Sequence, residues 1–432
     1  MKKRILTPLV FWPALLFAQK GIYFQNKHTY TWEQLKQKAK TENKYIFVDC
    51  FATWCGPCKL MDQEVYSADS VGEFFNKTFI SVKVQCDTSK SDGDDVKAWY
   101  ADAHQIVTEN KITAYPTFLF FSPEGKLVHE DVGYQPTHDF LASGQAALNP
   151  HQQYYTLLER YQKGMKEYSE MPYLVSMAQK LSEKELSQSI AADYIRNYLD
   201  KLPDTAFLTK ENITFIALSP PNLDSKERIF DWCFHQPAKI DTILHDKGFS
   251  GKVVNYVVYK EELIPPMMAA QASGSEPDWN AISKSIDHKF GSTFVEENVL
   301  TAQLRWYRNA QDWKKYIKFL IAKMDHDKVE QNTPKDFWGI VGLNSSAWDI
   351  FEHSDNKDEL RKALIWSDIV IANAEPKSGH NYGEFIDTKA NLLYKLGRKT
   401  EALALEAKAK EMTTNDKIQE TYKKMQEGKP TW

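Results

Sequence analysis

The sequence predicts an α/β domain at the N-terminus followed by a long all-α region. Short β-rich runs alternate with helical patterns up to about residue 148, whereas residues 151–432 contain few such runs and many helical patterns. The chain has 432 residues, enough for two or three domains that each bury a core. We expect an α/β domain over residues 25–148, a helical region over 150–290 and helical hairpins over 291–428.

The elements of the α/β domain follow from local patterns. Residues 31–43 form an amphipathic pattern with Thr31 as the N-cap of a helix. The apolar, β-rich runs that predict strands are YIFVDCF (45–51), FISVKVQ (79–85), TFLFF (117–121) and KLVHEDVG (126–133). Helical patterns lie between the first two strands and before the third, and this order of elements is an α/β layout.

The last part of the chain is repetitive. The runs LRKALIWSDIVIANAEP (360–376) and TEALALEAKAKEMT (400–413) each follow a helix that ends in a turn, and small residues allow close approach of paired helices. Over residues 337–425 this pattern resembles the tetratricopeptide class of helical repeats, although its spacing is longer than the usual period of about 34 residues. A plain helical bundle is the alternative. Stacked hairpins form concave surfaces suited to peptide or protein partners.

The first twenty residues, MKKRILTPLVFWPALLFAQK, have the pattern of an export signal. A basic start precedes an apolar run that is too short to span a bilayer, and Ala18 stands at a suitable cleavage point. We predict a signal peptide over residues 1–18 and an exported protein, periplasmic or extracellular, that does not span the membrane. A buried N-terminal helix is the alternative, which Pro8 and Pro13 disfavour.

Charge and cysteine content exclude several classes of function. The formal net charge is −4, from 54 basic and 58 acidic residues in mixed order, so nothing indicates nucleic-acid binding. Five cysteines in so long a chain do not indicate a disulfide-stapled scaffold. We expect Cys233 in a helical core. Cys50 and Cys86 should lie late in two neighbouring strands, either as ordinary buried thiols or as a regulatory pair.

The chemistry of the chain is concentrated in ATWCGPCKLM, residues 52–61. Cys55 and Cys58 are three positions apart, so they share a face at the start of a helix and can form a disulfide. Cys55 would lie at the helix N-terminus, where free N–H groups and the macrodipole lower the pKa of a thiol. We therefore expect Cys55 to attack a disulfide and Cys58, deeper in the helix and more buried, to resolve the intermediate.

Zinc binding and a purely structural disulfide are the alternatives for this pair. Zinc needs two further ligands, but Cys86 and Cys233 are isolated, and His28 and His104 are not suitably spaced. A disulfide that closes so short a loop adds little stability. We therefore predict no metal and no cofactor.

WCGPCK (54–59) resembles the active-site motif of the thioredoxin family. The run CKLMDQEVYSADSVGEFF (58–75) is similar to thioredoxin-like domains of exported proteins, including the soluble reductase domain of a membrane electron transporter. The resemblance covers residues 30–148 and implies an α/β thioredoxin fold with thiol–disulfide exchange activity. The helical remainder lies outside it.

The resemblance also implies roles for residues around the two cysteines. Asp49 matches the family's buried aspartate; inside an apolar strand its pKa should be raised, and it would act as general base toward Cys58. Lys83 matches a lysine often found near that aspartate, and it either tunes Asp49 or is simply exposed. The residues implied in substrate binding are Trp54, Tyr115, the cis-proline Pro116 and Gly133.

The dipeptide between the cysteines bears on the direction of electron flow. Oxidants and isomerases of this fold commonly have a His there, whereas Gly56 and Pro57 carry no charge, which favours a reductant. The sequence therefore predicts a reductase of cysteine-containing exported proteins, supplied by a membrane electron donor. The alternatives are a docking protein with a non-catalytic thioredoxin-like domain, and a disulfide oxidase or isomerase.

Overall fold

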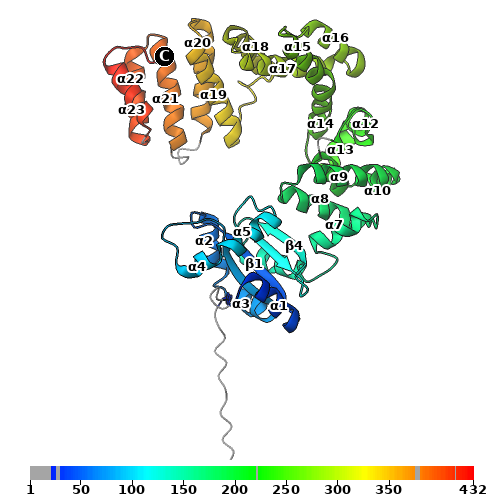
Figure 1. The fold of residues 1–432 in the computed structure, drawn as a ribbon. Coiled ribbons are helices and arrows are strands. Elements are labelled where there is room, and N and C mark those ends of the chain that lie inside the picture. The colour runs from blue at the N-terminus through cyan, green and yellow to red at the C-terminus, as the bar shows by residue number, and fades with distance from the viewer. Residues whose placement is uncertain (1–20, 26–29, 220–221, 375–379, 414) are drawn as a thin grey trace, which may run out of the picture. The chain divides into compact units, whose positions relative to one another are not determined.

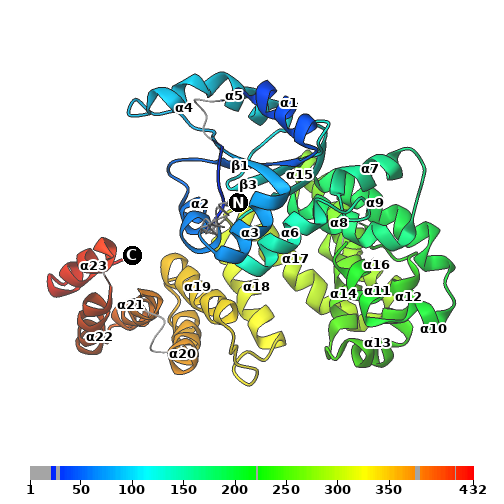
Figure 2. The same cartoon turned by 90° about the horizontal axis from the view of Figure 1, so that it is seen from below.

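The structure, a computed structural model, shows an N-terminal sheet domain and a long series of helices (Figures 1 and 2). It describes residues 21–25, 30–219, 222–374, 380–413 and 415–432. The predicted signal peptide over residues 1–18 lies outside the described residues. The chain divides into two compact units, Met1–Asn222 and Leu223–Trp432. The separate boundary predicted near residue 290 stays a prediction.

A four-stranded sheet of order β2-β1-β3-β4 forms the centre of the N-terminal domain. Its strands are β1 (Tyr45–Phe51), β2 (Phe79–Gln85), β3 (Thr117–Phe121) and β4 (Leu127–Val132). Strand β1 runs parallel to β2 and antiparallel to β3, and β3 is antiparallel to β4. Each strand begins and ends within one residue of the run that predicted it, because continuous apolar runs match strands buried on both faces.

Helices cover both faces of this sheet, which confirms the predicted α/β thioredoxin fold. The helices and the π-helical turn of the domain are α1 (Trp32–Glu42), α2 (Gly56–Leu60), η1 (Met61–Val65), α3 (Asp69–Thr78), α4 (Asp94–Ala98), α5 (Tyr100–Glu109) and α6 (Thr137–Ala146). Neighbouring residues of β1 point to opposite faces: Val48 packs in the core under α1 and α5, and Phe47 in the core under α3 and α6. On the second face, Phe75 stacks on Phe140 with ring centroids 4.6 Å apart.

Strand β4 is joined to the first helix of the helical region, α7 (Tyr154–Gln162), by buried polar contacts. The backbone N–H of Tyr154 donates to Nδ1 of His129 at 3.3 Å, and the hydroxyl of Tyr155 donates to the carboxyl of Glu130. Burial raises the pKa of Glu130 to about 7, against the opposing effect of the Tyr155 hydrogen bond. The helical region therefore begins as an integral part of the sheet domain.

The rest of the described chain is helical, as predicted. In the first unit, α7 is followed by η2 (Tyr168–Glu170), α8 (Met171–Lys180), α9 (Lys184–Asn197), η3 (Leu199–Lys201), α10 (Asp204–Phe207) and α11 (Lys210–Ala217). The second unit contains α12 (Arg228–His235), α13 (Pro237–Leu244), α14 (Phe249–Val258), η5 (Tyr259–Leu263), α15 (Ile264–Ser273), α16 (Trp279–Phe290), η6 (Ser292–Phe294), α17 (Val295–Asn309), α18 (Trp313–His326), α19 (Phe337–His353), α20 (Lys357–Asn373), α21 (His380–Lys395), α22 (Lys399–Met412) and α23 (Asp416–Gln426). Within the described ranges, no helix combines the length and the apolar character needed to cross a bilayer. Cys233 is buried in α12, as expected.

Four of the last five helices form two packed pairs, α19 with α20 and α21 with α22, and the members of each pair lie side by side in Figure 1. Ala390 of α21 and Ala402 of α22 are fully buried in one shared core, so the small residues do mark close helix approach. The assignment to the tetratricopeptide class stays a prediction.

A pair of carboxyl groups is buried between α21 and α22. Glu406 is completely buried and Asp387 is 8% exposed. Asn391 donates to Oδ1 of Asp387 at 2.9 Å. Burial, together with the charge of Asp387, raises the pKa of Glu406. Glu406 therefore keeps its proton at neutral pH.

Candidate active site

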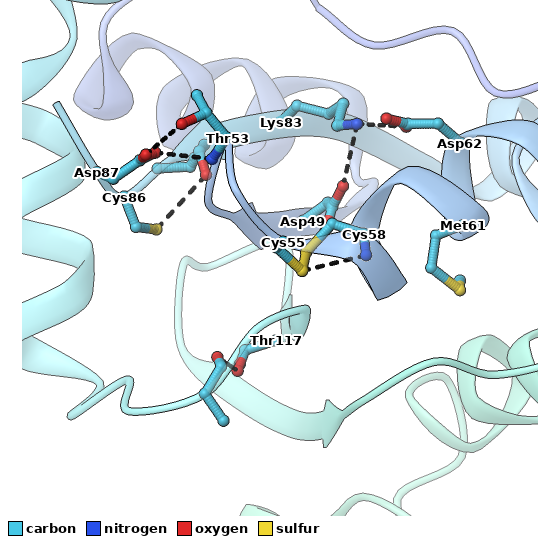
Figure 3. The surroundings of a disulfide bond; sticks show 12 residues. Asp49, Thr53, Cys55, Cys58, Met61, Asp62, Lys83, Cys86, Asp87 and Thr117 are labelled. Carbon is cyan, nitrogen blue, oxygen red and sulfur yellow. Dashed lines mark hydrogen bonds and ion pairs between the residues drawn. A yellow bond between two sulfur atoms is a disulfide. The ribbon is translucent and has the colours of Figure 1, made fainter. Parts of the chain in front are cut away.

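Cys55 and Cys58 are joined by a disulfide at the start of α2, directly after β1 (Figure 3). The S–S distance is 2.03 Å and the Cα atoms are 5.3 Å apart. Cys55 is the N-cap residue, and its sulfur accepts a hydrogen bond from the backbone N–H of Cys58 at 3.1 Å. Pro57 lies in the first turn, where its missing N–H leaves no hydrogen bond unmade. The sulfur of Cys55 is thus placed where a helix stabilises negative charge.

Burial does not distinguish the two cysteines, contrary to the expectation that Cys58 is the more buried. Cys55 is 2% exposed and Cys58 is 3% exposed. The reason is that both sulfurs pack in one small cluster with Ala52, against which Phe51 and Tyr115 also pack. The different roles expected of the two thiols must therefore come from hydrogen bonding and charge.

Asp49 is a buried carboxyl at the level of the disulfide (Figure 3). It lies in β1, six residues before Cys55, and is 1% exposed. Burial raises the pKa of Asp49 to about 6, against the lowering effect of the nearby Lys83 ammonium group. A carboxyl with this pKa is mostly ionised at neutral pH and still basic enough to accept a proton.

Lys83 lies beside Asp49 because the parallel register pairs these two residues across β1 and β2. Its Nζ is 3.6 Å from Oδ2 of Asp49, and it also forms an ion pair with Asp62. Of the two alternatives for Lys83, the structure shows the one in which it contacts the aspartate. Asp62 was not singled out from the sequence; its position one helical turn after Cys58 was the signal that marks it.

Among the residues implied in substrate binding, Tyr115 packs against the cluster that contains the disulfide, and Trp54 and Pro116 contact or adjoin Tyr115. Trp54 is 71% exposed, and its ring meets that of Tyr115 edge-on with centroids 6.0 Å apart. The Tyr115–Pro116 peptide bond is cis. The backbone N–H of Gly133 donates to the carbonyl of Pro116 at 2.8 Å, so these two loops are joined. Gly133 has a φ of +85°, a backbone conformation that favours glycine.

A hydrogen-bonded carboxylate fixes the loop that carries Trp54 (Figure 3). Asp87, which follows β2, accepts hydrogen bonds from the backbone N–H of Thr53 at 3.0 Å and from the Thr53 hydroxyl. The two residues are 34 positions apart, so no local pattern in the sequence indicated this contact. It holds the segment immediately before the first cysteine in place.

One cluster of potential metal ligands occurs in the described parts of the chain, formed by Glu297, His326 and Asp327. Lys323 lies within it, with its Nζ 3.2 Å from a Glu297 oxygen and 2.5 Å from an Asp327 oxygen. The ammonium group already supplies the positive charge that these carboxylates attract. The cluster is therefore better described as an ion-pair network than as a metal site.

Comparisons with known proteins agree with this geometry. A family model named Thioredox_DsbH, described as "Protein of unknown function, DUF255", matches residues 23–166. A thioredoxin from Aspergillus fumigatus is 31% identical over 101 residues, which are 23% of this chain and 76% of that protein. A thioredoxin from Mycoplasmoides gallisepticum is 30% identical over 113 residues, 26% of this chain and 93% of that protein.

A solved structure titled DsbH oxidoreductase is 15% identical and covers 34% of this chain and 94% of its own, with a TM-score of 0.26. The two thioredoxins match over most of their own length, and the residues that the family model matches, 23–166, include the Cys55–Cys58 disulfide. The chain therefore belongs to the thioredoxin-like superfamily, as a thiol–disulfide oxidoreductase with an appended helical region.

Proposed function

We propose that the protein is an exported thiol–disulfide reductase that uses Cys55 as the attacking thiol and Cys58 as the resolving thiol. The observation that carries this proposal is the hydrogen bond from the Cys58 N–H to the sulfur of Cys55 at the start of α2. The same N–H would stabilise a Cys55 thiolate once the disulfide has been reduced. A thiolate is the form that attacks disulfides.

The first step of the proposed reaction binds the substrate covalently to Cys55. With the pair reduced, the Cys55 thiolate attacks one sulfur of a substrate disulfide and forms a mixed disulfide, while the other substrate sulfur leaves as a thiolate and takes up a proton. The exposed ring of Trp54 and the edge-on ring of Tyr115 form the surface that a substrate segment would meet. Pro116 and Gly133 border it.

The second step releases the substrate. Asp49 accepts the proton of the Cys58 thiol, directly or through a water, and the Cys58 thiolate attacks the sulfur of Cys55. The substrate's second sulfur leaves as a thiol, and Cys55 and Cys58 again form the disulfide seen in the structure. Two electrons have passed to the substrate, and an external donor must supply them for the next cycle.

The direction of electron flow is inferred from the residues between the cysteines. Gly56 and Pro57 carry no ionisable side chain, so nothing between the two thiols selectively stabilises the reduced form. A reductant in an oxidising compartment needs an electron donor, for which we propose a membrane electron transporter. The helical region would then bind partner proteins, consistent with its stacked hairpins.

The proposal is tested by measuring the reduction potential of the Cys55–Cys58 pair in graded thiol buffers. We expect a value nearer about −270 mV, as in thioredoxin, than about −120 mV, as in a strong oxidant of the same fold. A value at the oxidising end would make the protein a disulfide donor or isomerase. A pair that shows no reversible couple would leave the protein as a docking module.

Partners are identified with a Cys58→Ser variant of the full chain, which cannot resolve the mixed disulfide. We expect covalent complexes through Cys55 that dissolve on addition of dithiothreitol. A Cys55→Ser/Cys58→Ser variant is the matched control, because it retains the surface and lacks both thiols. Equal recovery of partners by the two variants would favour docking through the helical region over thiol exchange.

A further inference from the structure

Helix α15 in the second unit is uncharged and largely apolar, yet little of it is covered. Its sequence is IPPMMAAQAS, and of its ten residues, all of them within the described chain, only Ala270 is buried. Ile264 is 39% exposed and Met268 is 64% exposed. Apolar surface that stays in water costs free energy, and a contiguous patch of it marks a binding surface.

A pocket lies between α15 and α17, which both pack against η5. Its volume is about 580 Å³, within the range of roughly 300–1,000 Å³ that is usual for binding pockets. Met267 and Met268 of α15 and Trp306 of α17 provide its apolar walls. Methionine side chains are flexible and polarizable, so such walls adapt to apolar groups of different shapes. The pocket therefore suits a large apolar side chain.

Glu276, the acidic residue in the lining of this pocket, already has partners. Nζ of Lys315 lies 2.5 Å from Oε2 of Glu276, and the hydroxyl of Tyr307 donates to Oε1. These hydrogen bonds lower the pKa of Glu276, so the carboxylate is ionised and Lys315 balances its charge. A positively charged partner therefore gains little from Glu276.

Arg305, which lines the pocket from α17, has a charge that is not balanced in this way. Its guanidinium carbon is 5.3 Å from the centre of the Tyr259 ring, and Nη1 donates to the Tyr259 hydroxyl at 3.3 Å. The next arginine of α17, Arg308, pairs with Asp349 at 3.5 Å, whereas no carboxyl group in the described ranges pairs with Arg305. Tyr259 thus orients a guanidinium group whose remaining N–H groups can bind a carboxylate.

We propose that the α15–α17 pocket binds a segment of a partner protein in which a large apolar side chain adjoins an Asp or Glu carboxylate. The apolar side chain lies between Met267, Met268 and Trp306, and the carboxylate accepts hydrogen bonds from Arg305. The charge of Arg305 selects against basic segments. This inference rests on the proposed function in one respect, because it gives the helical region its surface for partner proteins; no thiol takes part in it.

The test uses the full chain with Cys55→Ser/Cys58→Ser, so that nothing is captured through the active-site thiols. A random library of short, cysteine-free peptides displayed on phage is selected on this protein. We expect enrichment of peptides in which Phe, Leu, Met or Trp stands beside Asp or Glu. Enrichment of basic peptides would overturn the proposal, and so would enrichment no greater than on a surface without the protein.

A double-mutant cycle then tests the contact with Arg305. Binding of one enriched peptide is measured by calorimetry, and Arg305→Gln should weaken it by roughly tenfold to a hundredfold. Replacing the acidic residue of the peptide by its amide should weaken binding to a similar extent, with little further loss in Arg305→Gln. Arg196→Gln, at an exposed position of α9, is the matched control and should bind like its parent. Two losses that simply add would show that the carboxylate does not contact Arg305.

Met268→Lys tests the apolar wall and separates this partner from other occupants. The side chain is mostly exposed, so the variant should fold and lose peptide binding. A dimer in sedimentation experiments that Met268→Lys abolishes would show that a second copy covers α15. Binding of octanoate without selection of any peptide would show that the pocket takes a small amphiphile. Either result would overturn the proposal, and neither bears on the reductase activity, because this background lacks Cys55 and Cys58.

Discussion

Asp49 in the sheet domain and Glu406 in the helical region are both buried carboxyl groups with raised pKa values, yet their surroundings differ. Asp49 lies 3.6 Å from the ammonium group of Lys83 and next to the Cys55–Cys58 disulfide (Figure 3). Glu406 faces another carboxyl group, Asp387, between two packed helices. In the first arrangement the carboxylate of Asp49 is ionised and could accept a proton from a neighbouring thiol. In the second arrangement Glu406 keeps its proton.

The comparison shows that burial of a carboxyl group does not by itself mark a catalytic site. What matters is whether the group has a partner that can give or take a proton during a reaction. Asp49 has a dithiol near it, and Lys83 limits the rise in its pKa. Glu406 has no thiol or cation among the causes of its shift, only burial and Asp387. We therefore propose a catalytic role for Asp49, whereas Glu406 belongs to the core between α21 and α22.

The largest expected effect is on activity, and it distinguishes the sheet domain from the helical region. Cys55→Ser should abolish reduction of a protein disulfide such as that of insulin, because it removes the proposed attacking thiol at the N-cap of α2. Glu406→Gln should leave the rate unchanged. The turbidity assay of insulin reduction measures both. Full activity in Cys55→Ser would show that the sheet domain is not the catalytic part.

Asp49→Asn should slow disulfide reduction by roughly a hundredfold at neutral pH, the size expected for loss of a general base. In the wild type the rate should fall as the pH drops below about 6, because the protonated form of Asp49 cannot accept a proton. The variant should lack this acidic limb. A pH profile of single-turnover rates provides the measurement, and an unaltered limb would assign it to another group.

The same substitution should stabilise the sheet domain. The folded-state pKa of Asp49 is raised, so the folded state favours the protonated form and the wild type loses stability as the pH rises from about 4 to 6. Asp49→Asn removes that loss, by roughly 3 kcal/mol at pH 7. Chemical denaturation of both proteins at pH 4 and pH 7 measures the difference. If the variant is less stable than the wild type at pH 7, the buried charge of Asp49 does not destabilise the fold.

Glu406→Gln should change stability and its pH dependence without an effect on activity. Burial raises the pKa of Glu406, so the helical region should lose stability as the pH rises above the ordinary range of a glutamate, about 4.5. Gln has nearly the same shape and cannot ionise. At pH 8 the variant should be more stable by about 1 kcal/mol or more. Denaturation curves at pH 5 and pH 8 test this. An equal loss of stability in the wild type and the variant would contradict a raised pKa of Glu406.

The smallest effect is expected from Lys83→Gln. Loss of the ammonium group removes an influence that lowers the pKa of Asp49, so the acidic limb of the rate profile should move to higher pH by roughly one unit. Lys97→Gln, at an exposed position of α4, is the matched control and should leave the profile in place. Equal profiles for both variants would show that Lys83 does not act on Asp49.

Much of the sheet domain was predictable because its signals are local. The run YIFVDCF became β1 without a change of bounds, and the spacing of Cys55 and Cys58 indicated a disulfide. Contacts between distant residues were not predictable in the same way. The ion pair between Asp62 and Lys83 depends on how η1 lies against β2.

For the helical region, only the helical secondary structure was predictable from the sequence. In TEALALEAKAKEM, Glu406 looks like an ordinary surface glutamate of an amphipathic helix, yet it is completely buried. Its position follows from the close approach of α21, which no local pattern specifies. The equal burial of Cys55 and Cys58 has a similar origin, because Tyr115, which packs against both, comes from a loop far along the chain.

The contacts between β4 and α7 set a limit on how the protein can be divided for experiments. A fragment that ends near residue 148 would leave the carboxyl group of Glu130 without the Tyr155 hydroxyl and would expose the imidazole of His129 to water. The match to the family model also extends beyond α7, because it ends at residue 166 and α7 ends at Gln162. We therefore expect a fragment that folds on its own to be longer than the thioredoxin fold itself and to include α7.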